Sequence, residues 1–235
     1  MKQTEGPHRA DFFKTLKGKF VIDPRRTAIV TVDMHRGHLD PAVATLPAPK
    51  ENCANLIANG ARVLRAARAA GMPVIHGVTS KLLIENERPR AFHRAVMDVN
   101  ETIIPGEKSD FLHHNLKGSV QTEIIPELLE ETDYVINNKK THSVFFGTDL
   151  DNLLRILDVD HLVFMGVNTN TCVMNACFDA SNLRYTLAVV SDCVDSFYGP
   201  DLHEFGLENI RRCLGWVFDS DEMVEKFKSA MAEAL

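Results

Sequence analysis

The chain has 235 residues, enough for one α/β domain whose core needs no disulfide to hold it. Hydrophobic residues make up 45% and charged residues 25%, a composition of globular rather than disordered or fibrous proteins. There are 26 Lys and Arg residues against 32 Asp and Glu residues, and the formal net charge of −6 argues against nucleic acid or an anionic membrane as a partner.

The cysteines and the first residues indicate the cellular compartment. The five cysteines are odd in number and show neither CxxC nor zinc-finger spacing, which is typical of reduced thiols in a cytoplasm. The opening stretch MKQTEGPHRADFFKTLKGKF is too polar for a signal peptide, and no later run reaches membrane-spanning length. We therefore expect a soluble, cytoplasmic protein.

The first part of the chain predicts an arm followed by a strand-helix-strand unit. Residues 1–26 lack clean periodicity and are expected to pack as an arm on the domain or on a neighbouring subunit. The run TAIVTV at 27–32 is typical of a strand buried on both faces. Apolar residues at helical spacing in 52–70 and a second apolar run at 74–78 complete the unit, which implies parallel strands.

Residues 79–120 are the least regular part of the sequence, with prolines, a glycine and a mixture of charges and histidines. A segment this long between a strand and the next element is more often functional than a plain connector. We expect a lid or an oligomer contact here.

Strands and helices alternate through the second half of the chain. The predicted strands are 134–136, 162–165, 187–190 and 216–218, and the predicted helices are 124–129, 149–157, one that begins at Cys172, 202–213 and 221–235. No linker or repeat interrupts this order. The sequence therefore predicts one doubly wound α/β domain over 27–235, a three-layer, Rossmann-type fold with a mainly parallel sheet and helices on both faces.

Three polar residues follow three of the predicted strands: Asp33, Lys139 and Cys172. Taken singly, each has an ordinary alternative, namely a turn-forming Asp, a solvated lysine in the pair with Lys140, and a buried, inert cysteine. Cys172, however, opens a predicted helix, whose N-terminus favours the reactive thiolate. Parallel strands bring their carboxyl ends to one edge of a sheet, so the three residues can converge there.

The chemistry that needs this trio is attack of a thiolate on a carboxamide or similar acyl carbon. Asp33 would accept the thiol proton and later pass it to the leaving nitrogen. Lys139 would hold Asp33 in place and offset the negative charge of a carboxylate beside a thiolate.

The segments that carry these residues, TAIVTVDM, KKTHSVFFGTDL and GVNTNTCV, resemble the isochorismatase-like cysteine hydrolases. This superfamily includes nicotinamidases, N-carbamoylsarcosine amidases, ureidoacrylate amidohydrolases and biuret hydrolases, and the resemblance spans residues 26–235. It implies that Asp33, Lys139 and Cys172 form a catalytic triad. It also implies a non-proline cis peptide between Val167 and Asn168, with the backbone N–H groups of Asn168 and Cys172 as the oxyanion hole.

Two departures from the family pattern concern substrate and metal. Many members have glutamine where this chain has His35, followed here by Arg36 and His38. Nicotinamidases carry a metal-binding Asp-x-His after the second strand, but this chain reads HGVTSKLL there. We expect no metal and no cofactor, although His35, His38 and Asp40, with His113–His114 nearby, are close enough in sequence to suggest metal ligands. The alternative is that these histidines bond to backbone or water.

Four residues are candidate substrate contacts: His35, Arg36, His142 and Phe145. Arg36 can pair with a substrate carboxylate or form an ordinary salt bridge. His142 and Phe145 follow Lys139 on a loop that faces the same edge, where Phe145 would form part of the core and part of the pocket wall. The side chain of Asn168 would either contact the substrate or bond within its turn.

The hypothesis from sequence is a metal-independent amide hydrolase for a small carbamoyl, ureido or carboxamide compound, releasing ammonia or an amine through a Cys172 thioester. The stretch NIRRCLGWVFDSDEM resembles the ureidoacrylate branch. Two alternatives are a metal-dependent, nicotinamidase-type amidase and a non-catalytic protein that only binds a ligand. A homo-oligomer, a dimer or tetramer, is expected from the resemblance and from the arm and lid.

Overall fold

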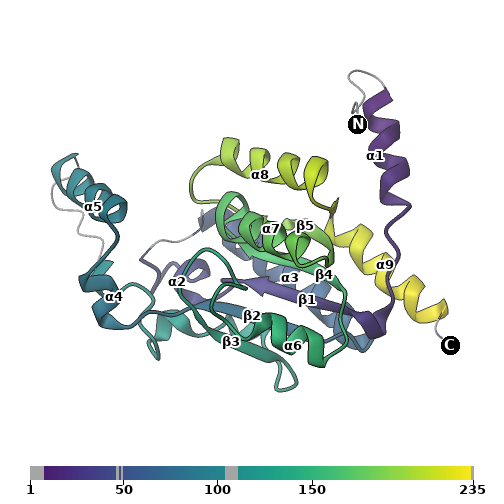
Figure 1. The fold of residues 1–235 in the computed structure, drawn as a ribbon, viewed down its shortest axis with the longest axis horizontal. Coiled ribbons are helices and arrows are strands. Elements are labelled where there is room, and N and C mark those ends of the chain that lie inside the picture. Colours follow the sequence, from purple (N-terminus) through teal and green to yellow (C-terminus); the bar gives the residue numbers. More distant parts are fainter. Residues whose placement is uncertain (1–7, 46–47, 49, 104–110, 234–235) are drawn as a thin grey trace.

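Six parallel strands form one sheet in the order β3-β2-β1-β4-β5-β6 in the computed structural model (Figure 1). The structure describes residues 8–45, 48, 50–103 and 111–233. The strands are β1 (Thr27–Val32), β2 (Val74–Thr79), β3 (Tyr134–Lys139), β4 (His161–Val167), β5 (Thr186–Asp195) and β6 (Trp216–Phe218). The strand order reverses between β1 and β4, which confirms the predicted doubly wound fold.

Helices cover both faces of the sheet. One face carries α3 (Lys50–Ala69) and α9 (Ser220–Glu233), and the other carries α6 (Leu150–Ile156), α7 (Met174–Asn182) and α8 (Pro200–Cys213) (Figure 1). Neighbouring residues of β1 point to opposite faces, so Ile29 joins the first core while Ala28 and Val30 join the second. Burial of a central strand on both faces explains its continuous apolar sequence.

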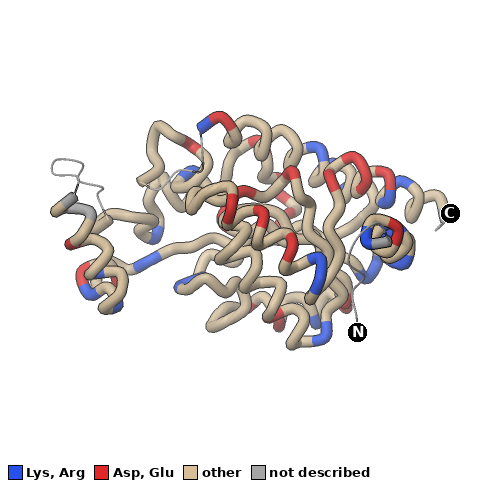
Figure 2. Tube along the Cα trace, turned by 90° about the horizontal axis from the view of Figure 1, so that it is seen from above, with Lys and Arg blue, Asp and Glu red and all other residues tan. Residues whose placement is uncertain are grey.

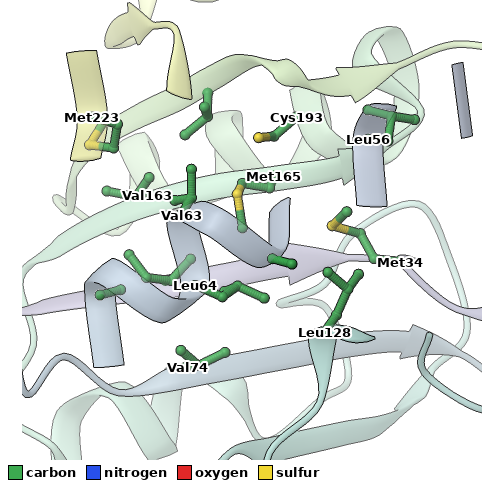
Figure 3. Close-up of a cluster of buried hydrophobic side chains, with 14 of the residues drawn as sticks. Met34, Leu56, Val63, Leu64, Val74, Leu128, Val163, Met165, Cys193 and Met223 are labelled. Atoms are coloured by element: carbon green, nitrogen blue, oxygen red, sulfur yellow. The ribbon is translucent and has the colours of Figure 1, made fainter. Parts of the chain in front are cut away.

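The core under α3 and α9 is drawn in Figure 3. Val63 and Leu64 of α3 and Met223 of α9 pack against Val163 and Met165 of β4. These side chains are fully buried, and burial of this kind contributes about 1.5–3 kcal/mol per large apolar side chain. The central strands are thereby held from both sides, and their carboxyl ends are held with them.

The predicted arm at 1–26 contains a helix, α1 (His8–Lys17), in its described part. This helix contacts its own domain: Arg9 pairs with Glu208 of α8 at 2.7 Å, and Lys17 pairs with Glu222 of α9 at 2.6 Å. The indole N–H of Trp216 donates to the carbonyl of Leu16 at 2.8 Å. Anchoring through polar side chains rather than an apolar stripe explains why periodicity did not reveal the helix.

The predicted lid or oligomer contact at 79–120 contains two helices, α4 (Leu83–Glu87) and α5 (Ala91–Ile103), and a short helical turn at Phe111–His113. Residues 104–110 of this segment lie outside the described residues. Figure 1 shows α4 and α5 extending away from the sheet. A role of this segment as a lid or contact stays a prediction.

Several element boundaries differ from the predicted ones. The predicted helix 124–129 is only a 3-10 turn, Pro126–Leu128, because proline restricts the residue before it and donates no hydrogen bond. Strand β5 continues past the predicted end through polar residues Ser191 and Asp192 to Asp195. Strand β3 also continues to Lys139 through polar residues, as an edge strand permits. No helix among the described residues is long and apolar enough to cross a membrane.

Gly166 allows β4 to approach β1 at the level where the strands end. Its φ is +122°, and a Cβ at this position would overlap the carbonyl of Val32. We expect Gly166→Ala to lower the free energy of unfolding by about 3 kcal/mol or more, because backbone strain and steric overlap add.

Gly71→Ala is the matched control, since Gly71 has a φ of +75° and open space around its Cα. We expect it to cost only about 1 kcal/mol. Equal losses in the two variants, measured by urea unfolding, would show that the close approach of the strands is unimportant.

Candidate active site

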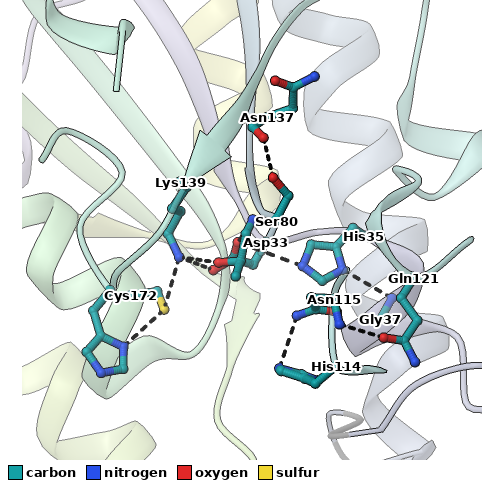
Figure 4. A network of polar contacts seen from close by, with 12 residues as sticks. Asp33, His35, Gly37, Ser80, His114, Asn115, Gln121, Asn137, Lys139 and Cys172 are labelled. Carbon is teal, nitrogen blue, oxygen red and sulfur yellow. Dashed lines mark hydrogen bonds and ion pairs between the residues drawn. The ribbon is translucent and has the colours of Figure 1, made fainter. Parts of the chain in front are cut away.

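The three residues predicted at strand ends meet at the carboxyl edge of the sheet (Figure 4). Asp33 directly follows β1, and Lys139 is the last residue of β3. Cys172 lies in η5 (Thr169–Val173), a π-helical turn between β4 and α7. The strand order reverses between β1 and β4, and doubly wound sheets bind ligands at such a position.

A buried ion pair joins the first two of these residues. Lys139 Nζ lies 2.6 Å from Asp33 Oδ2, and each side chain is 1% exposed. The ammonium also donates to Thr79 Oγ1 at 2.7 Å and to Cys172 Sγ at 3.6 Å. Figure 4 shows Lys139 between Asp33 and Cys172. All three ammonium hydrogens therefore have a partner, as a buried charge requires.

The backbone of β1 and β2 fixes Asp33. Its φ is +56°, a conformation that Asp tolerates better than most residues. Its N–H donates to the carbonyl of Gly77 at 2.8 Å, and its Oδ1 accepts the N–H of Thr79 at 2.8 Å. Sequence reasoning missed Thr79, although a polar residue at the end of a buried strand is the same signal that identified Asp33.

The ionisation of the site follows from its burial and charges. Burial alone would raise the pKa of Asp33, but the charge and hydrogen bond of Lys139, together with the neighbouring His35 and His38, outweigh burial and hold that pKa below its ordinary value. Burial alone would lower the pKa of Lys139, but Asp33 and Cys172, through their charges and hydrogen bonds, together raise it above its ordinary value. At neutral pH the pair is therefore a carboxylate and an ammonium.

The thiol of Cys172 differs from what the sequence predicted. Burial raises its pKa, Lys139 lowers it in part, and Asp33 raises it further, so the net shift is upward. The α-helix begins at Met174, after the π turn, so Cys172 is not on its first turn. The N-terminus of α7 therefore does not favour the thiolate in the way that the sequence indicated, and the thiol needs a nearby base, the role expected of Asp33.

Cys172 has a further partner in His142. The imidazole Nδ1 lies 3.6 Å from Cys172 Sγ, within hydrogen-bonding distance for sulfur. His142 is exposed on the loop after β3. Partial burial of its ring and the charge of Lys139 lower its pKa, which favours the neutral imidazole.

The turn before Cys172 begins at a cis peptide bond between Val167 and Asn168. The carbonyl of Asn168 accepts the N–H groups of Thr171 and Val173, both at 3.1 Å. The side chain of Asn168 accepts the N–H of Phe197 at 3.0 Å, so it bonds to a distant loop and not within its own turn. The oxyanion-hole role of the N–H groups of Asn168 and Cys172 stays a prediction.

The other predicted substrate contacts lie in three different environments. His35 is fully buried, and its Nε2 lies 3.8 Å from Asp33 Oδ1. Arg36 pairs with Asp40 and Glu123, each at 3.0 Å, which agrees with the alternative that Arg36 forms an ordinary salt bridge. Phe145 is buried in the core below α6 and α7, with its ring 6.1 Å from that of Tyr185. Contact of these residues with a substrate stays a prediction.

The residues considered as metal ligands are bonded to other groups. Asp40 accepts from Arg36 and from the N–H of Ala42 at 3.0 Å, and His35 Nδ1 accepts the N–H of Gly37 at 3.1 Å. Burial lowers the pKa of His35 to about 3, so its ring is neutral. Within the described ranges, no three His, Cys, Asp or Glu side chains are grouped so that they could hold a metal ion.

Comparison with known proteins identifies the family. The sequence profile of the isochorismatase domain matches residues 27–222. The chain belongs to the isochorismatase family. It is similar to the ureidoacrylate amidohydrolase RutB of Variovorax paradoxus, with 28% identity over 216 residues that cover 88% of this chain and 83% of the relative.

Solved structures show the same isochorismatase fold. A cysteine hydrolase from Pseudomonas syringae pv. phaseolicola has a TM-score of 0.74 and 24% identity, over 90% of this chain and 97% of that one. N-carbamoylsarcosine amidase from Thermoplasma acidophilum has a TM-score of 0.62 and 26% identity, over 83% and 97% of the two chains. The predicted family and fold are confirmed, and the chain is a hydrolase of this family.

Removal of Lys139 tests the buried ion pair. Lys139→Met leaves the Asp33 carboxylate buried without a cation, and we expect the free energy of unfolding to fall by about 3–5 kcal/mol. Lys140→Met is the matched control, because the ammonium of Lys140 pairs with Glu85 at 3.0 Å near the surface and such pairs contribute less than about 1 kcal/mol. A loss no larger than that of the control would contradict the importance of the buried pair.

The pH dependence of stability gives a second test. The pKa of Asp33 is lowered in the folded protein, so its stabilisation is complete above the unfolded carboxylate pKa of about 4 and is lost as pH falls below it. We expect the difference in unfolding free energy between wild type and Asp33→Asn to be largest near pH 7 and to shrink toward pH 2. Urea unfolding at several pH values measures this difference, and a constant difference would refute the assignment.

Proposed function

We propose that this protein is a cysteine-dependent amide hydrolase that cleaves small carbamoyl, ureido or carboxamide compounds, with Cys172 as the nucleophile. The supporting observation is the buried Asp33–Lys139 pair, whose ammonium lies 3.6 Å from Cys172 Sγ. Similarity to RutB and to N-carbamoylsarcosine amidase supports the carbamoyl or ureido substrate class.

The first half of the reaction forms a thioester. The carboxylate of Asp33 accepts the thiol proton, and Cys172 Sγ attacks the carbonyl carbon of the substrate. The N–H groups of Asn168 and Cys172 donate to the oxyanion of the tetrahedral intermediate. Asp33 then passes its proton to the leaving nitrogen, the C–N bond breaks, and ammonia or an amine departs.

The second half of the reaction hydrolyses the thioester. A water oxygen attacks the acyl carbon, the C–S bond breaks, and the sulfur recovers a proton while the acid product leaves. Lys139 serves both halves, because its ammonium offsets the negative charge that moves between the carboxylate of Asp33 and the sulfur.

A metal-dependent, nicotinamidase-type amidase is the enzymatic alternative. It is disfavoured because the Asp-x-His pair of nicotinamidases is missing after β2 and because the carboxylate of Asp40 accepts hydrogen bonds from Arg36 and Ala42. Metal analysis of the purified protein distinguishes the two proposals. Stoichiometric zinc, iron or manganese that activity requires would favour the alternative.

Cys172→Ala tests the nucleophile. We expect a folded protein whose ammonia release falls at least about a thousandfold, because no other group can form the covalent intermediate. The assay is an ammonia-release screen over ureas, biuret, triuret, carbamoyl amino acids, maleamate and nicotinamide. The control is Cys213→Ala at an exposed cysteine, which should keep full activity. Undiminished ammonia release by Cys172→Ala would refute the mechanism.

Labelling with iodoacetamide tests the alternative that the protein only binds a ligand. We expect Cys172 to react faster than Cys53, because the ammonium of Lys139 stabilises its thiolate and the carboxylate of Asp33 can accept its proton, whereas burial and the charge of Asp195 raise the pKa of Cys53. Mass spectrometry of the labelled peptides measures the two rates. Equal rates would support the binding alternative.

A further inference from the structure

His142 links the nucleophile to solvent. Its Nδ1 lies 3.6 Å from Cys172 Sγ, and the residue is exposed, whereas Asp33 is fully buried. The sulfur thus has an acceptor on its inner side and another on its outer side. The triad alone does not use the outer one.

The hydrogen bonds of Asp33 favour a second proton acceptor, separate from Asp33, for the hydrolysis of the thioester. Its Oδ2 accepts from Lys139 and its Oδ1 accepts from Thr79. Once the sulfur carries an acyl group, incoming water arrives from the exposed side, where His142 lies. The lowered pKa of His142 leaves its ring neutral at neutral pH, so it can accept a proton there.

We infer that His142 is the general base that activates water for hydrolysis of the thioester, a role that rests on the proposed function. The water oxygen bonds to the acyl carbon while one water proton moves to Nδ1. The C–S bond then breaks, and its electron pair returns to the sulfur beside Lys139. The imidazolium passes its proton to the sulfur, which restores both the thiol and the neutral ring.

His142→Gln tests this role, because glutamine keeps hydrogen bonding but cannot accept the proton. The substrate is the compound of the ammonia screen that the wild type cleaves fastest. We expect a rapid burst of about one ammonia per active site, then a steady state with kcat reduced about 100-fold and kcat/KM little changed. Intact mass spectrometry should show the acyl group on Cys172, and hydroxylamine should restore turnover.

The control is His161→Gln, at the amino end of β4 and the opposite edge of the sheet, which should behave as wild type. His142→Asn should reproduce His142→Gln. Equal losses of kcat and kcat/KM without a burst, or full activity, would overturn the role of His142. A wild type that cleaves none of the compounds, or an active Cys172→Ala, would instead refute the proposed function itself.

Discussion

The site depends on one buried ion pair, between Asp33 and Lys139. Each side chain is 1% exposed, and a single unpaired charge at this depth would cost several kcal/mol. Thr79 lies between the two residues and bonds to both, through its N–H and its hydroxyl. Strands β1, β2 and β3 must therefore end at matching levels, and the ion pair couples the register of the sheet to the chemistry of its edge.

The same burial determines how the nucleophile must work. Gly166 lets β4 reach β1, and the turn that follows places Cys172 over Lys139. In this enclosed position the thiol has a raised pKa, so the protein supplies the base from inside. The buried carboxylate of Asp33 is placed to transfer a proton within the enclosed site. The exposed imidazole of His142 is placed to accept a proton from water that enters from solvent.

The segment that carries α4 and α5 contacts the strands of the site. Helix α4 begins a few residues after Thr79. Lys140, next to the buried Lys139, pairs with Glu85 of α4 at 3.0 Å and donates to the carbonyl of Ser80. The base of α4 is thereby connected to two strands of the site, while Figures 1 and 2 both show α5 away from the sheet.

The sequence alone determined the fold and the convergence of Asp33, Lys139 and Cys172, because continuous apolar runs mark buried parallel strands and those strands end at one edge. Only the tertiary structure decided which neighbours each residue has. It showed that Thr79 accepts a hydrogen bond from Lys139 and that the imidazole of His142 lies beside the sulfur. It also showed that Phe145 is buried in the core and that the pKa of Cys172 is raised. Local patterns report burial and periodicity, whereas contacts and pKa values depend on strand order and on side chains distant in sequence.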